Sequence, residues 1–165
     1  MEIRHLFISP AHNFVGHFGG PAGTNPIVEV PEIECVAGSG IRGDRYFDHK
    51  PDYKGQITFF EIETHQRLCD EFAVFDKGPE VYRRNVIVAG RDLNELIGEE
   101  FEIQGVRFLG MEESKPCLWM NQAFAPGAEK ALRGKGGLRA MILTGGVLVF
   151  APTRKAPSPA CTRRH

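Results

Sequence analysis

Cys117 is the residue of this sequence whose type and neighbours best suit chemistry. It lies in the segment EESKPCLWMN, residues 112–121, directly after Pro116 and two residues after Lys115. Because proline disfavours a helical conformation of the residue before it, this segment is predicted to be a strand end or a turn. A nearby cation favours the thiolate, which acts as nucleophile or metal ligand. The alternative is that Cys117 is a small buried hydrophobic residue.

Arginines beside three predicted strands could form an anion site with this cysteine. If the fold brings two of these segments near Lys115 and Cys117, the forked guanidinium groups would match phosphate oxygens beside a thiolate. Asn85 could add an amide that donates and accepts hydrogen bonds. The alternative is that the arginines are solvated and pair with Asp44 and glutamates on the surface. The three pairs are Arg42 and Arg45, Arg83 and Arg84, and Arg133 and Arg139.

Histidines suggest two further kinds of site. A cysteine-dependent hydrolase would need a histidine near Cys117 in space, for which the candidates are His12, His17, His49 and His65. His12 and His17 could also ligate a metal from the glycine-rich loop of residues 12–23, but their spacing fits no recognised motif and no third ligand accompanies them. Metal binding there is a weaker hypothesis than chemistry at Cys117.

Length and composition restrict the class of protein. The 165 residues suffice for one domain, predicted over residues 1–150, and the 19 glycines and 11 prolines favour turns over long helices. The remaining residues, 151–165, form a basic, proline-rich tail that we expect to be disordered. The formal net charge is -1, and the acidic balance of the rest of the chain argues against nucleic-acid binding.

Cysteine spacing and hydropathy indicate the compartment. The four cysteines form no CxxC pair, which excludes a zinc ribbon and a thioredoxin-type motif. No secretory signal is visible, and the longest apolar stretch, residues 140–151, is too short to span a bilayer. We therefore expect reduced thiols in a cytoplasmic protein that does not span a membrane.

The hydrophobic pattern predicts a mainly β protein. Strands are expected at residues 3–8, 27–30, 33–36, 56–60, 85–89, 100–103, 106–109, 138–144 and 147–150. Helical segments are expected at residues 61–72, 92–97 and 126–132. Gln104-Gly105 and Gly145-Gly146 are each predicted to close a hairpin between the strands that flank them. This inventory indicates a β-barrel or sandwich with a few short helices.

One nucleotide-binding motif is rejected. Gly38, Gly40 and Gly43 match GxGxxG, but the motif needs a helix to start within it. Residues 44–51 show no helical period and end in a proline. We therefore expect these glycines to form turns that present Arg42, Asp44 and Arg45 at a loop tip.

Taken together, the motifs resemble a MOSC domain, a family named for the C-terminal domain of molybdenum cofactor sulfurases. The resemblance covers about residues 27–150, and the order and spacing of its motifs make the joint match specific. It is carried by Gly43-Asp44-Arg45, Gln56-Ile57-Thr58, Arg83-Arg84-Asn85 with the strand after it, Asp92-Leu93 with Leu96-Ile97-Gly98, Lys115-Pro116-Cys117, and Gly136-Gly137-Leu138-Arg139-Ala140. One departure is that Val147 to Phe150 runs directly into Ala151-Pro152, without the Gly-Asp that often follows the last hairpin.

The resemblance implies a MOSC-type β-barrel with a few short peripheral helices that binds the molybdenum cofactor, or molybdopterin. In this family the cysteine after proline ligates molybdenum or carries sulfur, which assigns the metal-ligand and catalytic role to Cys117. The implied cofactor-binding residues are Gly43, Asp44, Arg45, Arg83, Asn85, Lys115 and Arg139. Soft thiolate and forked guanidinium groups suit a molybdenum centre and a pterin phosphate.

Three functions follow as hypotheses. The first is a stand-alone molybdenum-dependent reductase of small N-hydroxylated or N-oxide substrates, which needs a separate electron-donor reductase because the resemblance covers no such domain. The second is a non-catalytic carrier of persulfide sulfur or of the cofactor. The third is the cysteine-dependent hydrolase considered above.

Overall fold

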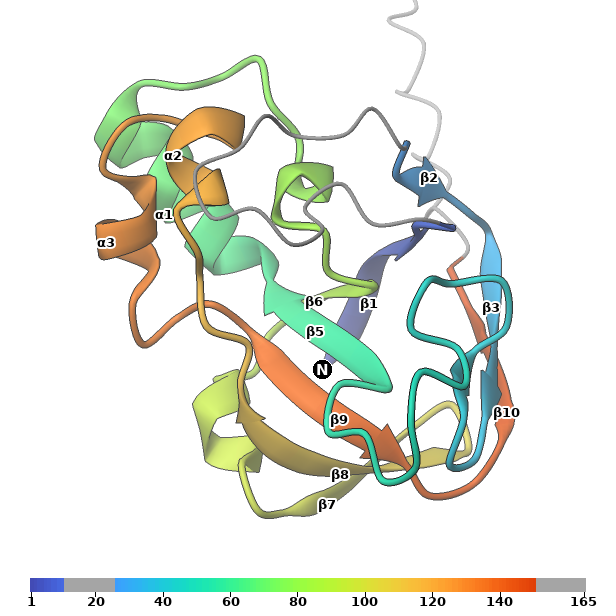
Figure 1. The fold of residues 1–165 in the computed structure, drawn as a ribbon. Helices are drawn as coiled ribbons and strands as arrows, with labels where there is room; N and C mark the ends of the chain where they lie inside the picture. Colours follow the sequence, from blue (N-terminus) through green and yellow to red (C-terminus); the bar gives the residue numbers. More distant parts are fainter. Residues whose placement is uncertain (11–25, 151–165) are drawn as a thin grey trace, which may run out of the picture.

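The structure is a computed structural model that describes residues 1–10 and 26–150 (Figure 1). The predicted loop of residues 12–23, with His12 and His17, lies outside the described residues. The tail, residues 151–165, also lies outside them. The predictions for these two segments therefore stay predictions.

The larger part of the fold is a curled sheet of seven strands (Figure 1). All neighbouring strands in it are antiparallel except β5 and β6, which are parallel. A second sheet has three antiparallel strands. In order across the larger sheet the strands are β2 (Val28–Glu29), β1 (Glu2–Ile8), β6 (Val86–Ala89), β5 (Ile57–Glu61), β9 (Leu138–Ile142), β8 (Val106–Glu113) and β7 (Glu100–Ile103). Those of the smaller sheet are β10 (Gly146–Val149), β3 (Glu32–Val36) and β4 (Gly40–Ile41).

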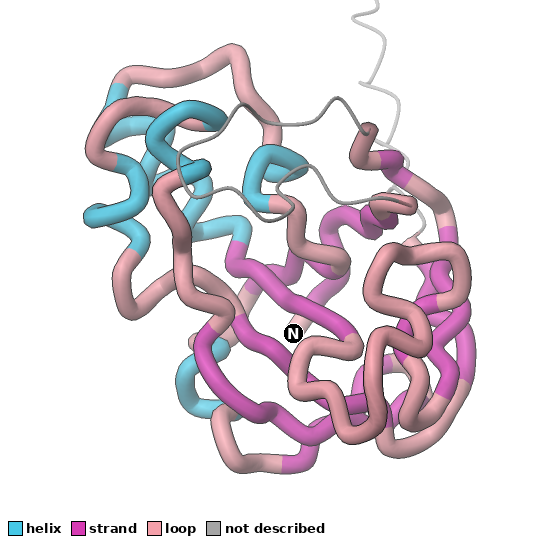
Figure 2. Tube along the Cα trace, viewed as in Figure 1, coloured by secondary structure: helices cyan, strands magenta, loops and turns pink. Residues whose placement is uncertain are grey.

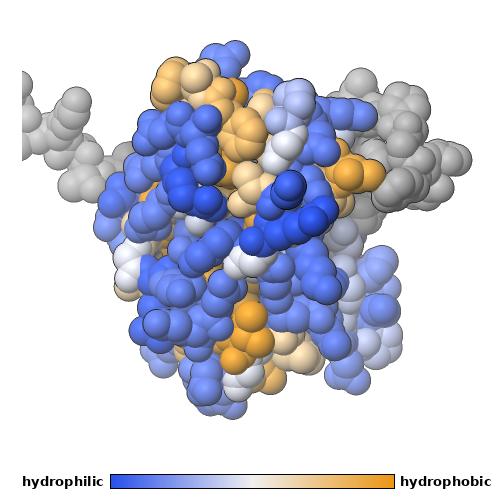
Figure 3. Space-filling view, turned by 90° about the vertical axis from the view of Figure 1, so that its left-hand side faces the viewer, coloured by the Kyte–Doolittle hydropathy of each residue, from blue (hydrophilic) through white to orange (hydrophobic). Residues whose placement is uncertain are grey.

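The helical segments are short, and α1, α2 and α3 gather on one side of the larger sheet (Figure 2). Most of the molecular face on that side is hydrophilic, with a few hydrophobic residues exposed between polar ones (Figure 3). Within the described residues, every helix is too short or too polar to cross a membrane. The segments are α1 (Ile62–Phe72), η1 (Pro79–Tyr82), η2 (Leu93–Leu96), α2 (Trp119–Ala123) and α3 (Ala128–Leu132).

Two hydrophobic clusters lie on opposite faces of the larger sheet. Successive residues of a strand point to opposite faces, so Phe59 of β5 joins the cluster between the sheets and Phe60 joins the cluster under the helices. Both side chains are almost completely buried. The first cluster includes Ile33 and Leu148 from the smaller sheet, so it joins the two sheets. Because β5 is covered on both faces, the adjacent residues Phe59 and Phe60 are both buried, and its sequence does not simply alternate between apolar and polar residues.

The predicted fold class is confirmed: the protein is mainly β with few short helices. The hairpin at Gln104-Gly105 is also confirmed, since β7 and β8 pair around it and both turn residues have positive φ. Gly43 has a φ of 87° and the residues after it form turns with no helix, in agreement with the rejection of the nucleotide motif. The predicted turn at residues 92–97 is a 3₁₀ helix capped by Asp92, whose carboxylate accepts from the Asn94 amide at 3.0 Å.

The predicted hairpin at Gly145-Gly146 is wrong. β9 pairs with β5 and β8 in the larger sheet, whereas β10 pairs with β3 in the smaller one. The chain therefore changes sheets at these two glycines. A Cβ atom at Gly145 would lie 3.1 Å from the carbonyl oxygen of Cys35, so the glycine permits a close approach to β3. Sheet membership depends on contacts between distant strands, which a local turn signal does not encode.

Candidate functional site

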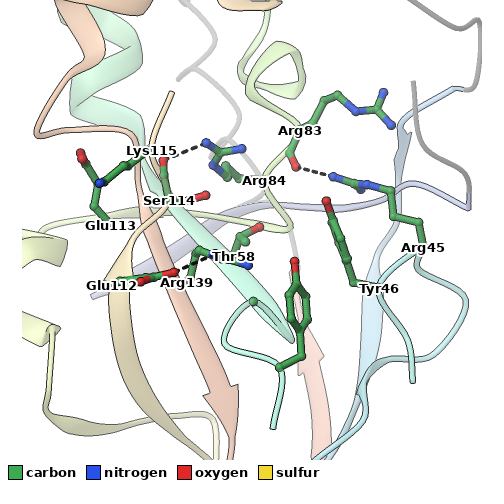
Figure 4. A pocket seen from close by; sticks show the side chains of 12 residues that line it. Arg45, Tyr46, Thr58, Arg83, Arg84, Glu112, Glu113, Ser114, Lys115 and Arg139 are labelled. Atoms are coloured by element: carbon green, nitrogen blue, oxygen red, sulfur yellow. Dashed lines mark hydrogen bonds and ion pairs between the residues drawn. The ribbon is translucent and has the colours of Figure 1, made fainter. Parts of the chain in front are cut away.

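The candidate site is a cavity of about 420 Å³ at one end of the larger sheet. Five of its lining residues are cationic and two are carboxylates, so its charge is strongly positive. In Figure 4, Arg45 and Tyr46 stand on one side of the cavity, and Arg84, Ser114 and Lys115 on the other. The lining residues are Arg45, Tyr46, Tyr53, Gly55, Thr58, Arg83, Arg84, Glu112, Glu113, Ser114, Lys115 and Arg139.

Four of the predicted cofactor-binding residues line this cavity: Arg45, Arg83, Lys115 and Arg139. Arg45 belongs to the turns after β4, and Arg83 is the left-handed residue that ends η1, with a φ of 57°. Lys115 follows β8, and Arg139 lies on β9. Four segments that are distant in the sequence thus supply cationic side chains to one cavity, whereas Arg42 and Arg133 of the predicted arginine pairs do not line it.

Asp44 and Asn85 do not line the cavity, but they hold the backbone behind it. The Asp44 carboxylate accepts from the Ser9 amide at 2.9 Å and from Asn85 Nδ2 at 3.4 Å. Asn85 Oδ1 in turn accepts from the Thr58 amide at 3.1 Å. Both side chains are buried, and their polar groups are used in these bonds. The prediction that Asp44 is presented at a loop tip is therefore wrong, because its carboxylate is bound inside the protein. Together they form a brace, a set of buried hydrogen bonds that links the end of β1, β5 and the turn at Gly43. Gly43 itself is exposed.

Arg45 is anchored by this brace. Its side chain is only 10% exposed, and Nη1 lies 3.6 Å from the buried Asp44 carboxylate. Nη2 donates to the carbonyl oxygen of Arg83 at 3.4 Å, a bond visible in Figure 4. The guanidinium group also lies over the Tyr46 ring, with Cζ 4.7 Å from the ring centroid. Arg45 is therefore held on several sides before any ligand binds.

Arg84 binds three backbone carbonyls. The sequence pattern gave no reason to distinguish its role from that of Arg83. The Arg84 guanidinium donates to the carbonyl oxygens of Tyr82 at 2.9 Å, Ser114 at 3.0 Å and Gly136 at 3.1 Å. Burial lowers the pKa of Arg84 to about 10, and the charge of Cys117 is the strongest influence in the opposite direction. Among the described residues, no carboxylate lies within ion-pair distance of Arg84. Its positive charge is therefore not neutralised by an ion pair and adds to the positive charge of the cavity.

Cys117 is exposed, so it is not the buried hydrophobic residue of the alternative interpretation. Its loop runs from β8 to α2 and borders the cavity through Ser114 and Lys115. Gly136 packs against this loop: a Cβ atom there would lie 2.8 Å from Pro116 Cδ and would also collide with the Ser114 carbonyl. The sulfur itself does not line the cavity.

The two carboxylates of the cavity differ in their partners. Glu112 accepts from Arg139 Nη1 at 2.7 Å and lies 3.8 Å from Lys54, so it offsets much of the charge of Arg139. Oε2 of Glu113 is buried and accepts no hydrogen bond from the described residues. With five cations against Glu112 and Glu113, the cavity keeps a net positive charge. A cavity of this charge suits an oxyanion.

No histidine contacts Cys117 within the described part of the chain. The cysteine and histidine that do meet there are Cys69 and His65, with Sγ 3.5 Å from Nε2, and burial raises the pKa of the Cys69 thiol. His65 also makes a 2.7 Å hydrogen bond with the Tyr82 hydroxyl, inside the cluster under the helices. The partner arrangement expected of a cysteine hydrolase is therefore not found at Cys117 in residues 1–10 and 26–150. No group of three or more histidine, cysteine or acidic side chains in those residues is placed to hold a metal ion.

Comparison with known proteins gives the fold. No protein-family model matches the sequence, and no curated protein matches it either. The structure of the YuaD protein from Bacillus subtilis is similar over 90% of both chains, with a TM-score of 0.70 and 19% sequence identity. YiiM from Escherichia coli is similar with a TM-score of 0.60 and 17% identity, over 74% of this chain and 60% of YiiM. YiiM from Geobacillus stearothermophilus has a TM-score of 0.52 and 16% identity, over 58% of this chain and 51% of that one.

These similarities establish a mainly β fold shared with YuaD and YiiM. The match to YuaD spans nearly all of both chains, whereas this chain covers less than two thirds of either YiiM protein. The identities are low, so the shared property is the arrangement of strands and helices. What the site binds is argued from the residues that line it.

Proposed function

We propose that this protein is a MOSC-domain protein that binds the molybdenum cofactor, with Cys117 as the molybdenum ligand. The observation that carries the proposal is a cationic cavity of about 420 Å³ bordered by the loop of an exposed cysteine. The sequence motifs that resemble the MOSC family and the fold shared with YuaD and YiiM support it.

The residues present fit this cofactor. Its phosphate needs fixed cationic donors. One cavity offers five of them: Arg45, Arg83, Arg84, Lys115 and Arg139. Its metal needs a soft ligand that is reachable from outside, and Cys117 is exposed. When bound, the cofactor supplies two-electron redox chemistry, while the chain supplies binding, orientation and charge.

The activity that we propose is the reduction of small N-hydroxylated or N-oxide substrates. Arg84 binds the Ser114 carbonyl and Gly136 packs against Pro116, so the segment directly before Cys117 is held against the rest of the fold. Electrons would come from a separate reductase partner. A cytoplasmic location agrees with the three free cysteines of the described residues, Cys35, Cys69 and Cys117.

A second candidate is a carrier that transfers sulfur or cofactor without turnover. The observation that favours it is the exposure of Cys117, together with the lack of a hydrogen-bond partner for its sulfur among the described residues. In the sulfur-carrier form, Cys117 holds a persulfide and passes the outer sulfur to an acceptor thiolate. This function needs no metal on the protein.

Metal content after expression in a host that makes the cofactor tests the leading proposal. We expect purified protein to carry molybdenum and pterin, and Cys117→Ala to lose most of the molybdenum. Cys69→Ala is the matched control. Cys69 is partly accessible, but it lies on α1, packs against the cluster under the helices and does not line the cavity. Metal-free wild-type protein, or Cys117→Ala with full metal, would contradict the proposal.

Mass spectrometry of the intact protein separates the two candidates. A carrier of sulfur predicts one additional sulfur atom on Cys117 that a reductant such as a thiol removes, in protein that lacks molybdenum. The reductase predicts an unmodified Cys117 after the cofactor is released. Both measurements use the same preparation, so they report on one population of molecules.

A further inference from the structure

Two tyrosines of the cavity wall stack on each other, and the ring of each also makes a cation–π contact with an arginine. The rings of Tyr46 and Tyr53 have centroids 5.4 Å apart and planes inclined by 30°. Arg45 Cζ lies 4.7 Å from the Tyr46 centroid, and Arg139 Cζ lies 5.1 Å from the Tyr53 centroid. All four residues line the cavity. The electron-rich face of a phenol ring attracts a guanidinium group, so each contact is favourable.

The segment between the two tyrosines is folded so that they meet. His49 lies between them in sequence. The centroid of its ring lies 5.5 Å from that of Tyr46 and 4.7 Å from that of Tyr53. Asp48 and Asp52 both have a φ of 52°, a left-handed conformation that non-glycine residues rarely adopt. The backbone thus accepts two unfavourable conformations in a loop in which the rings meet and Lys50 Nζ also lies 5.5 Å from the Tyr53 centroid.

Each arginine of the stack is also held from another side. The Glu112 carboxylate binds Arg139, and Gly55 lies so close that a Cβ atom there would be 2.8 Å from Arg139 Nε. Arg45 is held by Asp44 and by the Arg83 carbonyl, as described above. The guanidinium planes are therefore fixed by a ring on one side and by a polar partner on another. Burial and the neighbouring Tyr46 raise the pKa of Tyr53, so its ring is a neutral phenol at physiological pH and adds no negative charge.

We propose that Tyr46 and Tyr53 are positioning residues of the cationic cavity: their stack holds Arg45 and Arg139 ready for a phosphate-type oxyanion. A long side chain that is already ordered loses less conformational entropy when it binds, so the oxyanion binds more tightly. The inference rests on the proposed function in one respect, since the oxyanion would then be the phosphate of the cofactor. The role of the two rings can be tested without the cofactor.

The experiment measures binding of inorganic phosphate to cofactor-free protein by isothermal titration calorimetry. Tyr46→Leu and Tyr53→Leu are each expected to weaken phosphate binding by roughly two- to tenfold, the range that one cation–π contact implies. Tyr46→Phe and Tyr53→Phe keep the ring face and are expected to bind within about twofold of wild type. Phe47→Leu is the matched control. Arg42 Cζ lies 5.3 Å from the Phe47 ring centroid in the same loop, but neither residue lines the cavity.

Fluorinated phenylalanines at position 46 provide a second measurement if the leucine variants do not fold. Each added fluorine weakens the attraction of the ring for a cation while it changes the size of the ring little. We expect phosphate affinity to fall in steps as fluorines are added. Packing alone predicts no such trend, so the series separates positioning from a purely structural role.

Three outcomes would overturn the inference: leucine variants that bind phosphate as wild type does, a fluorine series without a trend, or wild-type protein that binds no phosphate. The proposed function fails on a different result, the absence of molybdenum from wild-type protein expressed with the cofactor. Molybdenum in wild type together with unchanged phosphate binding in the leucine variants would refute the role of the tyrosines alone.

Discussion

Arg84 Nη2 donates to the carbonyl oxygen of Ser114 at 3.0 Å, three residues before Cys117. The same guanidinium group binds the carbonyl of Gly136, in the connection before β9, and that of Tyr82, at the end of η1. One buried cation thus joins three segments at the place where the Cys117 loop leaves the sheet. This junction therefore holds the start of the segment that leads to Cys117.

Arg84→Met is expected to lower the free energy of unfolding by about 3 kcal/mol, because three carbonyls lose a charged donor. Arg84→Lys keeps the charge but not the fork, and an intermediate loss is expected. Urea denaturation followed by circular dichroism measures both. Arg133→Met is the control, since Arg133 forms an exposed ion pair with Glu129 whose loss is expected to change the unfolding free energy little. Equal stability of Arg84→Met and Arg133→Met would contradict the role given to Arg84.

Gly136→Ala is expected to displace the Cys117 loop, because the new methyl group would collide with the Ser114 carbonyl and lie 2.8 Å from Pro116 Cδ. A loss of about 2 kcal/mol or more in unfolding free energy is expected, together with weaker retention of molybdenum. Gly134→Ala is the comparison: its Cβ atom meets nothing within 4 Å, so only the strain of its φ of 82° remains. That strain is expected to cost about 1 kcal/mol and to leave metal content unchanged. Normal metal content in Gly136→Ala would show that the close packing is not needed.

Gln104 connects the two sheets with its side-chain amide. Nε2 donates to the Val149 carbonyl at 2.9 Å, and Oε1 accepts from the Val149 amide at 2.8 Å. Gln104→Ala is expected to cost about 1–2 kcal/mol of unfolding free energy, since both bonds are lost. Gln104→Gly loses them too but relieves the positive φ of 50°, so it is expected to cost less than alanine. A larger loss for glycine than for alanine in urea denaturation would contradict this account.

Stability is expected to depend on pH through His65. Burial lowers the pKa of His65 below its ordinary value of 6.5. The unfolded chain therefore takes up a proton near pH 6.5 while the folded protein does not. The stability contributed by the neutral His65 ring is full above that pH and is lost as the pH falls toward the pKa of His65 in the folded protein.

His65→Gln removes this titration. We expect the stability difference between wild type and His65→Gln to shift against wild type between pH 7.5 and pH 5.5, by at most about 1.4 kcal/mol per pH unit. The measurement is urea denaturation of both proteins at each pH, which cancels the titration of the carboxylates they share. A constant difference across this range would show that His65 is not buried as a neutral ring.

The strands were predictable because their residues carry a local signal. The apolar run before α1, residues 56–60, and the run after Asn85 each form a strand, since β-branched and aromatic residues fit a buried sheet. Partners of strands are not local, which is why the signal at Gly145-Gly146 indicated a hairpin where the chain instead changes sheets. Pairing is decided by packing of side chains such as Leu148 against the other sheet.

The cationic site was predictable in part. Arg45, Arg83, Lys115 and Arg139 were expected together and line one cavity. Asn85 was expected to face the same ligand, but it is used in the buried brace. The contributions of the tyrosines and of Arg84 were missed, because neighbouring arginines look alike in a sequence and stacking between rings depends on the folded loop.

The central claim is that the sulfur of Cys117 binds molybdenum, and X-ray absorption at the molybdenum edge of purified protein tests it most directly. We expect wild type and Cys69→Ser to show one more sulfur neighbour of the metal than Cys117→Ser, or Cys117→Ser to retain no metal at all. The same number of sulfur neighbours in a fully loaded Cys117→Ser would contradict the claim.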